Sequence, residues 1–333
     1  MTGALLDVRD LVVEFLSGEG LLRAVDGVSF GIDRGEIVGL VGESGAGKTL
    51  TAEAVLGLIR CPPGRVSGEV RFRGRNLLAL EERELASIRG KEIAMIFQNP
   101  GASLNPVFRV GDQLLEAMTL HLRDGRGALR RRAVEILTRV GIPSAATRAR
   151  DYPHQFSGGM AQRVMIGMGV SCLPSLLIAD EPTTALDVTI QAQVLALIRQ
   201  LARELGMAVL LVSHDLGIVS QMCHRVIVMY AGRIVEQAPI ATIFRAPAHP
   251  YTRALVACLP GLEDTRRLDA IPGVMPGLTA IPAGCRFHPR CPVAEPRCAV
   301  EAPTLRPVGP DQIAACHLVG MMADSRASRG RPA

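Results

Sequence analysis

The sequence predicts an α/β fold with a small loop-built segment at its C-terminal end. Three observations carry this prediction. The first forty residues alternate short apolar runs with glycine-containing turns, as β-strands do. Residues 36–58 read as a strand, a glycine-rich loop and a helix, a succession typical of α/β proteins. After about Phe244 the chain becomes rich in Pro, Gly and Cys, which indicates a separate unit.

The remaining elements follow from the spacing of apolar residues. The predicted strands lie at residues 5–15, 21–32, 36–42, 69–77, 92–98, 173–182, 208–215 and 225–236, the last with a turn inside it. Helical spacing covers residues 49–58, 101–152 and 188–205.

The bulk composition bounds the classes of protein to consider. With 333 residues and 48% hydrophobic content, the chain is long enough for two domains, or for one large domain with an appendage. The N-terminal MTGALLDVRD lacks a basic start and an apolar run, so no signal peptide is expected. The longest uncharged run, Val164 to Ala179, is too short to cross a bilayer. Any membrane role is therefore expected to be peripheral.

The basic residues are unevenly chosen, since only Lys48 and Lys91 are lysines among 37 basic residues. The densest arginine cluster, residues 123–132, raises the question of nucleic-acid binding. No interleaved aromatic residues and no nucleic-acid motif accompany this cluster. We therefore expect a solvated helix face and no nucleic-acid partner.

Residues Gly42 to Thr49, GESGAGKT, match the pattern G-x-x-x-x-G-K-[ST] between a strand and a helix. Glycines let such a loop point backbone N–H groups at phosphate oxygens, and the helix N-terminus adds partial positive charge. Lys48 is expected to reach the β- and γ-phosphates of ATP, and Thr49 to give its hydroxyl to Mg²⁺. A compact ammonium fits a narrow phosphate nest where a planar guanidinium does not. The expected ATP contacts are Gly42, Glu43, Ser44, Gly45, Ala46, Gly47, Lys48 and Thr49.

Two carboxylates follow a run of apolar residues in LLIADE. A buried strand would deliver Asp180 and Glu181 at its C-terminal end. We expect Asp180 to hold the Mg²⁺ shell and Glu181 to orient and deprotonate the attacking water. Alone, such a pair is also typical of a cap on the next turn, but together with the phosphate loop it indicates an ATPase.

The stretch FSGGMAQRV, residues 156–164, resembles the signature sequence of ABC-type ATPases. The other motifs of that family are similar and stand in the same order. Gln98 in IFQNP matches the Q-loop, residues 184–187 match the D-loop, His214 matches the switch histidine, and Phe15 stands where an aromatic ring stacks on adenine. The resemblance covers about residues 5–245.

This resemblance implies a P-loop NTPase core of the RecA-like type, with an antiparallel β-subdomain and a helical subdomain at about residues 100–160. It also implies two such units packed head to tail. Each ATP would lie between one unit's Lys48 loop and the Ser157, Gly158 and Gly159 of the other. Gln98 would join Thr49 and Asp180 at Mg²⁺. The catalytic residues would be Glu181, His214 and Gln98.

The signature departs from the family's usual sequence at one position, where Met160 replaces Gln. Because the serine and the glycines contact phosphate, we expect activity to survive this change. Cys172 and Cys223 lie in apolar surroundings and are expected to be small core residues.

Residues 99–116 and 249–260 resemble importer ATPases for dipeptides and oligopeptides. This likeness implies a second ATPase subunit, either a copy or a related chain, with two transmembrane permeases and an extracytoplasmic solute-binding protein. It places the chain on the cytoplasmic face of the inner membrane. Import of nickel, opines or glutathione remains open, since partner proteins set the solute. A non-transport role in DNA repair or translation is also weighed, but residues 48–157 carry no heptad run.

Cys285, Cys291, Cys298 and Cys316 lie in the segment predicted at residues 246–320, ahead of a tail at 321–333 expected to be disordered. Disulfides do not suit a chain without an export signal. Zinc sites usually show close C-x2–4-C pairs, and this spacing lacks them. Widely spaced cysteines suit a cubane cluster, and the resemblance to peptide importers also implies a [4Fe–4S] cluster. Zn²⁺ remains the alternative.

Overall fold

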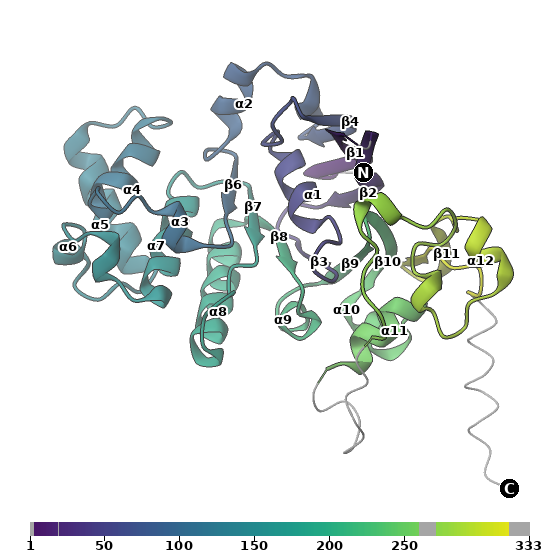
Figure 1. Cartoon of the computed structure of the whole chain (residues 1–333). Coiled ribbons are helices and arrows are strands. Elements are labelled where there is room, and N and C mark those ends of the chain that lie inside the picture. The colour runs from purple at the N-terminus through teal and green to yellow at the C-terminus, as the bar shows by residue number, and fades with distance from the viewer. Residues whose placement is uncertain (1–2, 19, 260–270, 320–333) are drawn as a thin grey trace, which may run out of the picture. The chain divides into compact units, whose positions relative to one another are not determined.

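The computed structural model describes residues 3–18, 20–259 and 271–319 (Figure 1). The chain divides into two compact units. The first, called the terminal unit here, holds residues 6–31, 38–78 and the chain from Ser213 onward. The second, the middle unit, holds residues 79–212 together with Ile32–Ile37 and the chain up to Leu5. Each unit contains its own strands, helices and candidate site residues.

An antiparallel sheet in the terminal unit has the strand order β2-β1-β4-β5. The strands are β1 (Leu6–Ser17), β2 (Gly20–Ile32), β4 (Gly64–Phe72) and β5 (Arg75–Asn76). The register of β1 and β4 runs from Leu6 opposite Phe72 to Phe15 opposite Gly64. Apolar residues along β1, such as Val8 and Val13, are buried, so the sheet packs one face inward.

The terminal unit also contains the strand order β11-β12-β10-β9-β3. Strand β3 pairs in parallel with β9, and the outer pairs are antiparallel. All residues of β3 are buried, as expected for a strand covered on both faces. The bounds are β3 (Ile37–Val41), β9 (Arg225–Tyr230), β10 (Arg233–Pro239), β11 (Arg306–Gly309) and β12 (Gln312–Ala314). The helices are α1 (Lys48–Val55), η1 (Leu77–Ala79), α9 (Leu216–Ser220), α10 (Ile240–Arg245), α11 (Pro250–Ala257), η3 (Leu278–Ala280), η4 (His288–Arg290) and α12 (Pro296–Val300).

The middle unit is built on three adjacent parallel strands in the order β8-β7-β6. They are β6 (Ile93–Ile96), β7 (Leu176–Asp180) and β8 (Ala208–Ser213). Strands β7 and β8 are entirely buried. Its helices are α2 (Glu82–Ile88), α3 (Pro100–Ser103), α4 (Val110–Thr119), α5 (Arg126–Arg139), α6 (Ala145–Arg148), η2 (Pro153–Gln155), α7 (Gly158–Val170) and α8 (Val188–Leu205).

The predicted strands and helices are confirmed along most of the chain. Helix α8 has the bounds that its amphipathic spacing predicts, and the uncharged run from Val164 is the end of α7 followed by β7. Across the ranges that the structure describes, no helix combines the length and the apolar character needed to cross a membrane.

The C-terminal segment differs from the prediction in being more than loops. It contains α11, α12 and the strands β11 and β12, and β12 extends the terminal unit's sheet by pairing with β10, Glu236 opposite Ala314. These strands are only three and four residues long, too short to show a periodic pattern in the sequence. The tail predicted at 321–333 lies outside the described residues.

Candidate nucleotide site

The phosphate loop joins β3 to α1 in the terminal unit, and its shape requires glycine. Gly45 and Gly47 have φ of 82° and 95°, a region that other residues rarely adopt. At Gly42 a side chain is excluded by space, since a Cβ there would lie 2.3 Å from the carbonyl oxygen of Met229. The glycine pattern read in the sequence therefore has a specific steric cause at each of these positions.

Lys48 is the first residue of α1, and its side chain folds back over the loop. Its Nζ donates to the carbonyl oxygens of Gly42, at 2.8 Å, and Glu43, at 3.0 Å. The residue is only 5% exposed, so these bonds compensate the burial of its charge. Ser44 and Gly45 on this loop are exposed, and so is Thr49 in the first turn of α1. The ammonium is thus fixed against the backbone of the loop that is predicted to bind phosphate.

Two further predicted residues belong to the terminal unit. Phe15 is half-buried on β1 opposite Gly64, and a Cβ on that glycine would lie 3.4 Å from the Phe15 ring. His214 is exposed directly after β8. The next residue, Asp215, caps α9 by accepting from the N–H groups of Gly217, at 2.7 Å, and Ile218. This cap holds the backbone beside His214 in a defined turn.

The middle unit contains the two predicted carboxylates. Asp180 is the buried last residue of β7, and Glu181 follows with φ of +46°, a strained conformation for this residue type. The Glu181 carboxylate accepts from Gln98 Nε2 at 2.8 Å and from Thr184 Oγ1 at 2.9 Å. The structure therefore joins three residues from the predicted Q-loop, strand end and D-loop. Sequence reasoning named the first two and missed the threonine.

The signature stretch begins α7 in the middle unit. Ser157 is the exposed N-cap, and its Oγ accepts from the backbone N–H of Met160 at 3.3 Å. Gly159 has little room for a side chain, since a Cβ there would lie 2.8 Å from Ile190. Met160 contributes a main-chain group to this cap, so the departure from Gln leaves the cap intact.

Comparison with known proteins decides the family. Residues 25–184 match the family described as ABC transporter, and residues 235–298 match the one described as oligopeptide/dipeptide transporter, C-terminal region. The chain is 48% identical to the dipeptide transport ATP-binding protein DppD of Escherichia coli, over 94% of this chain and 96% of that one. The chain belongs to the ABC transporter family. It is also 46% identical to the oligopeptide transport ATP-binding protein OppD of Salmonella typhimurium, over 94% of this chain and 93% of that one.

Solved ATP-binding cassettes share the fold of this ABC ATPase. A dimeric cassette, MJ0796, in a post-hydrolysis state with ADP and Pi, gives a TM-score of 0.64 at 26% identity. The match covers 71% of this chain and 98% of that one. The cassette cbiO1 of Clostridium perfringens gives 0.63 at 25% identity, covering 73% and 91%. The predicted P-loop ATPase fold is confirmed, and the family implies ATP as the ligand of this chain. The residues that contact ATP stay a prediction.

The four C-terminal cysteines converge within the terminal unit. All four line one narrow cavity of about 10 Å³, together with Phe287, Leu318 and three histidines, His249, His288 and His317. None of the four forms a disulfide in the described chain. Burial raises the pKa of Cys285 to about 11; the neighbouring cysteines contribute to this rise, and a hydrogen bond from the Phe287 backbone opposes it. Over residues 3–18, 20–259 and 271–319, no group of three or more His, Cys, Asp or Glu side chains is placed to hold a metal ion. The predicted cluster therefore stays a prediction.

Several residues that tie the C-terminal segment to the ABC ATPase core were missed in the sequence. Glu236 on β10 is fully buried and accepts from the backbone N–H groups of Ala248 and His249 and from Gln312 Nε2, all within 2.9 Å. Tyr251 Oη lies 2.9 Å from the backbone nitrogen of Glu43 in the phosphate loop. The stretch HPY at 249–251 was a usable signal, because buried polar residues need fixed partners.

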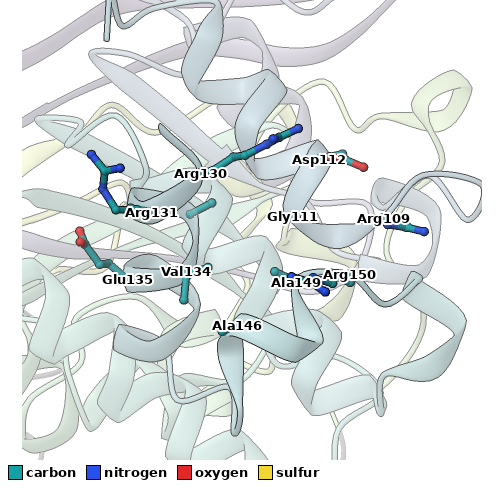
Figure 2. A pocket seen from close by; sticks show the side chains of 11 residues that line it. Arg109, Gly111, Asp112, Arg130, Arg131, Val134, Glu135, Ala146, Ala149 and Arg150 are labelled. Atoms are coloured by element: carbon teal, nitrogen blue, oxygen red, sulfur yellow. The ribbon is translucent and has the colours of Figure 1, made fainter. Parts of the chain in front are cut away.

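A cavity of about 630 Å³ lies among α4, α5 and α6 of the middle unit (Figure 2). Arg130 and Arg131, from the arginine cluster at 123–132, line it with Arg109 and Arg150. These four arginines are exposed, as the predicted solvated helix face requires. The carboxylates of Asp112 and Glu135 also line the cavity, so its charge is mixed.

Proposed function

We propose that this ABC ATPase is the ATP-hydrolysing subunit of a membrane importer for dipeptides and oligopeptides. The observation that carries the proposal is the double match: the motor region and the C-terminal region both match transporter families, and the second is the oligopeptide/dipeptide one. The relatives named for dipeptide and oligopeptide transport extend over nearly the whole chain. The chain would work at the cytoplasmic face of the membrane as a peripheral subunit.

In the proposed mechanism Glu181 is the general base that deprotonates the attacking water. Its bonds from Gln98 and Thr184 fix the carboxylate orientation, which supports this role because a base must be aimed before it can act. Asp180, Gln98 and Thr49 would hold Mg²⁺, which neutralises charge on the transferred phosphoryl group. His214, exposed after β8, would donate to the γ-phosphate.

The second half of each ATP site would come from a partner ATPase. Ser157, Gly158 and Gly159 present an exposed helix start, a geometry suited to an anion. We propose that it meets the γ-phosphate held by the partner's phosphate loop, the partner being a copy of this chain or a related one. The dimeric state of the cassette MJ0796 supports this arrangement.

The permease contact is proposed at the exposed apolar side chains around the loop that leads into α4. Val107 is 70% exposed and Phe108 53%, and Phe97 next to Gln98 is also exposed. The loop is rigid, since buried Gln113 accepts from the N–H of Asn105 and donates to the carbonyls of Asn105 and Phe108. Exposed apolar groups on a fixed loop are typical of a docking site. Closure of the ATPase pair would pull on the permease through this loop.

We further propose that Cys285, Cys291, Cys298 and Cys316 hold a [4Fe–4S] cluster. The support for this proposal is that four thiols line one cavity, which is one thiolate for each iron of such a cluster. As placed, they do not form a metal-binding group. The cavity has room for about one water, so a bound cluster would require the thiols to lie further apart than they do in this structure. Zn²⁺ is the alternative, and it would need the four sulfurs drawn together around one ion.

Co-purification of the tagged chain from its own cells tests the importer proposal. We expect two transmembrane permeases and a second ATPase to co-purify, and the associated solute-binding protein to carry peptides when its ligand is extracted and sequenced. A solute-binding protein carrying nickel, an opine or glutathione would replace the peptide substrate with that solute. Recovery of nucleic acid or ribosomes without a permease would contradict the importer itself.

A further inference from the structure

Arg290 lies in the cysteine segment, the stretch from Cys285 to Cys316, and forms an ion pair with a residue of the phosphate loop. It ends η4, one residue before Cys291, and its Nη1 lies 3.1 and 3.0 Å from the two carboxylate oxygens of Glu43. The two residues are 247 positions apart in the sequence, yet both belong to the terminal unit. A residue from outside the known ATP motifs thus contacts the loop that cradles the phosphates.

The guanidinium is held in place by several other groups. Its Nε donates to the carbonyl oxygen of Pro272 at 2.8 Å, and Nη1 lies 3.3 Å from Tyr230 Oη. The rings of Tyr230 and Phe287 lie 5.8 and 6.0 Å from its central carbon, within cation–π distance. Arg290 is 9% exposed. The guanidinium is therefore fixed in place and is not a mobile surface charge.

Three groups of Glu43 have bonding partners: its N–H, its carbonyl oxygen and its carboxylate. Its N–H meets Tyr251 Oη at 2.9 Å, its carbonyl oxygen accepts from Lys48 Nζ at 3.0 Å, and its carboxylate meets Arg290. The same carbonyl that accepts from Lys48 therefore belongs to a residue whose side chain is fixed by Arg290. A displacement of the carboxylate would be transmitted to the loop and to its lysine.

The charge on Glu43 adds an electrostatic reason for the pair. An uncompensated carboxylate on the phosphate loop would repel the phosphates of ATP, because like charges at short range are unfavourable. We propose that Arg290 is a positioning residue of the ATP site: it neutralises Glu43 and holds the loop in its phosphate-binding shape. The proposal rests on the ATPase activity of the family and is independent of what the cysteines bind.

Kinetics of full-length variants, assembled with their permeases, test the proposal. For Arg290→Ala we expect the KM for ATP to rise about three- to tenfold, with a much smaller change in kcat, and the effect to shrink as salt screens the exposed carboxylate. Adding Glu43→Gln to this variant removes the repelling charge and should restore most of the lost ATP affinity. Arg290→Lys should lie between, because it keeps the charge and loses the bonds that hold the guanidinium, such as the one from Nε to the carbonyl oxygen of Pro272.

Arg297→Ala is the matched control, since Arg297 lies in the same segment and is paired with Glu295 at the surface. It should leave KM unchanged. A thermal unfolding scan of each variant separates folding from positioning. If Arg290→Ala lowers the unfolding temperature while KM stays at the wild-type value, Arg290 is only a structural residue. If Glu43→Gln fails to restore affinity at any salt concentration, the electrostatic role is wrong.

Discussion

The phosphate loop and the cysteine segment, the part of the C-terminal segment from Cys285 to Cys316, differ in how far along the sequence their bonding partners lie. Lys48 bonds to carbonyls five and six residues before it, so the loop's chemistry is contained in one motif. The cysteine segment is held by residues distant in sequence: Arg286 pairs with Asp26, and Arg290 pairs with Glu43. The comparison teaches that a local motif identifies the ligand, whereas the residues that support the site come from elsewhere in the chain.

The two arginines of the segment also differ from each other. Arg286 shares the buried Asp26 carboxylate with Arg23 and Arg233, and in the described part of the chain none of these four side chains forms an ion pair with a phosphate-loop side chain. Arg290 contacts the phosphate loop itself. We expect changes at the first cluster to alter stability and changes at the second to alter ATP binding.

The largest expected effect is the loss of ATP turnover when Glu181, the proposed general base of the ABC ATPase, is replaced. Glu181→Gln should lower turnover by about 10²- to 10⁴-fold while leaving ATP binding intact, because it removes the base and keeps the side-chain shape. Single-turnover hydrolysis, ATP titration and gel filtration measure this, and the variant should accumulate as a closed dimer. The control is Glu204→Gln, an exposed partner of Arg139 on α8. Near-normal hydrolysis in the Glu181 variant would refute the role.

Lys48→Ala tests directly whether the phosphate loop binds ATP. We expect ATP affinity to fall at least tenfold, since a buried charge partner of the phosphates is lost. Equilibrium titration with ATP measures the change, and Lys91→Ala, which alters the chain's second lysine, is the control. Unchanged affinity would show that the loop does not cradle phosphate.

Cys285→Ser tests the proposed cluster in the distant segment. In anaerobically purified protein we expect the iron and sulfide content to fall below half of the wild-type value. Cys61→Ser is the matched control, because Cys61 is exposed and far from the cavity in sequence. Wild-type protein that is colourless and holds stoichiometric zinc without iron would replace the cluster with the zinc alternative.

The smallest effect is expected at Asp26. Burial alone would raise the pKa of Asp26, but Arg233, Arg286 and Arg23 together lower it below its ordinary value. The ionised form is therefore favoured in the folded chain, so this stabilisation is present above about pH 4 and is lost as pH falls through the lowered pKa. Asp26→Asn should cost about 2 to 3 kcal/mol of unfolding free energy at pH 7.

Urea unfolding between pH 7 and pH 3 measures this contribution. The difference between wild type and Asp26→Asn should narrow as the pH falls below 4. Glu295→Gln, at a surface pair, should change stability by less than about 0.5 kcal/mol. A difference that stays constant down to pH 3 would contradict the ion-pair account.

Much of the fold was predictable because its signals are local. Apolar runs predicted β3, β7 and β8, and amphipathic spacing predicted α8. Lys48 and Glu181 could be named from their motifs, and their roles stay predictions. The bond from Gln98 to Glu181 joins residues 83 positions apart and was not visible in the sequence. Thr184, which donates to Glu181, could be named only as part of the D-loop motif. A single side-chain hydrogen bond produces no periodic pattern in the sequence from which it could be predicted.

The C-terminal segment was less predictable for a physical reason. Strand β12 pairs with β10, and β11 pairs with β12, so these short strands depend on their neighbours more than on their own propensity. Arg290 looked like one arginine among 35, and its role depends on where the fold places Glu43. Long-range ion pairs of this kind are fixed by tertiary structure alone.

Uptake of a labelled dipeptide tests the central claim most directly. Cells lacking the chromosomal copy would be supplied with the wild-type chain or with Glu181→Gln at equal expression. We expect ATP-dependent uptake with the wild-type chain, its loss with Glu181→Gln, and competition by other dipeptides but not by nickel or glutathione. Equal dipeptide uptake with the wild-type chain, the variant and no chain would contradict the account of this protein as the motor of a peptide importer.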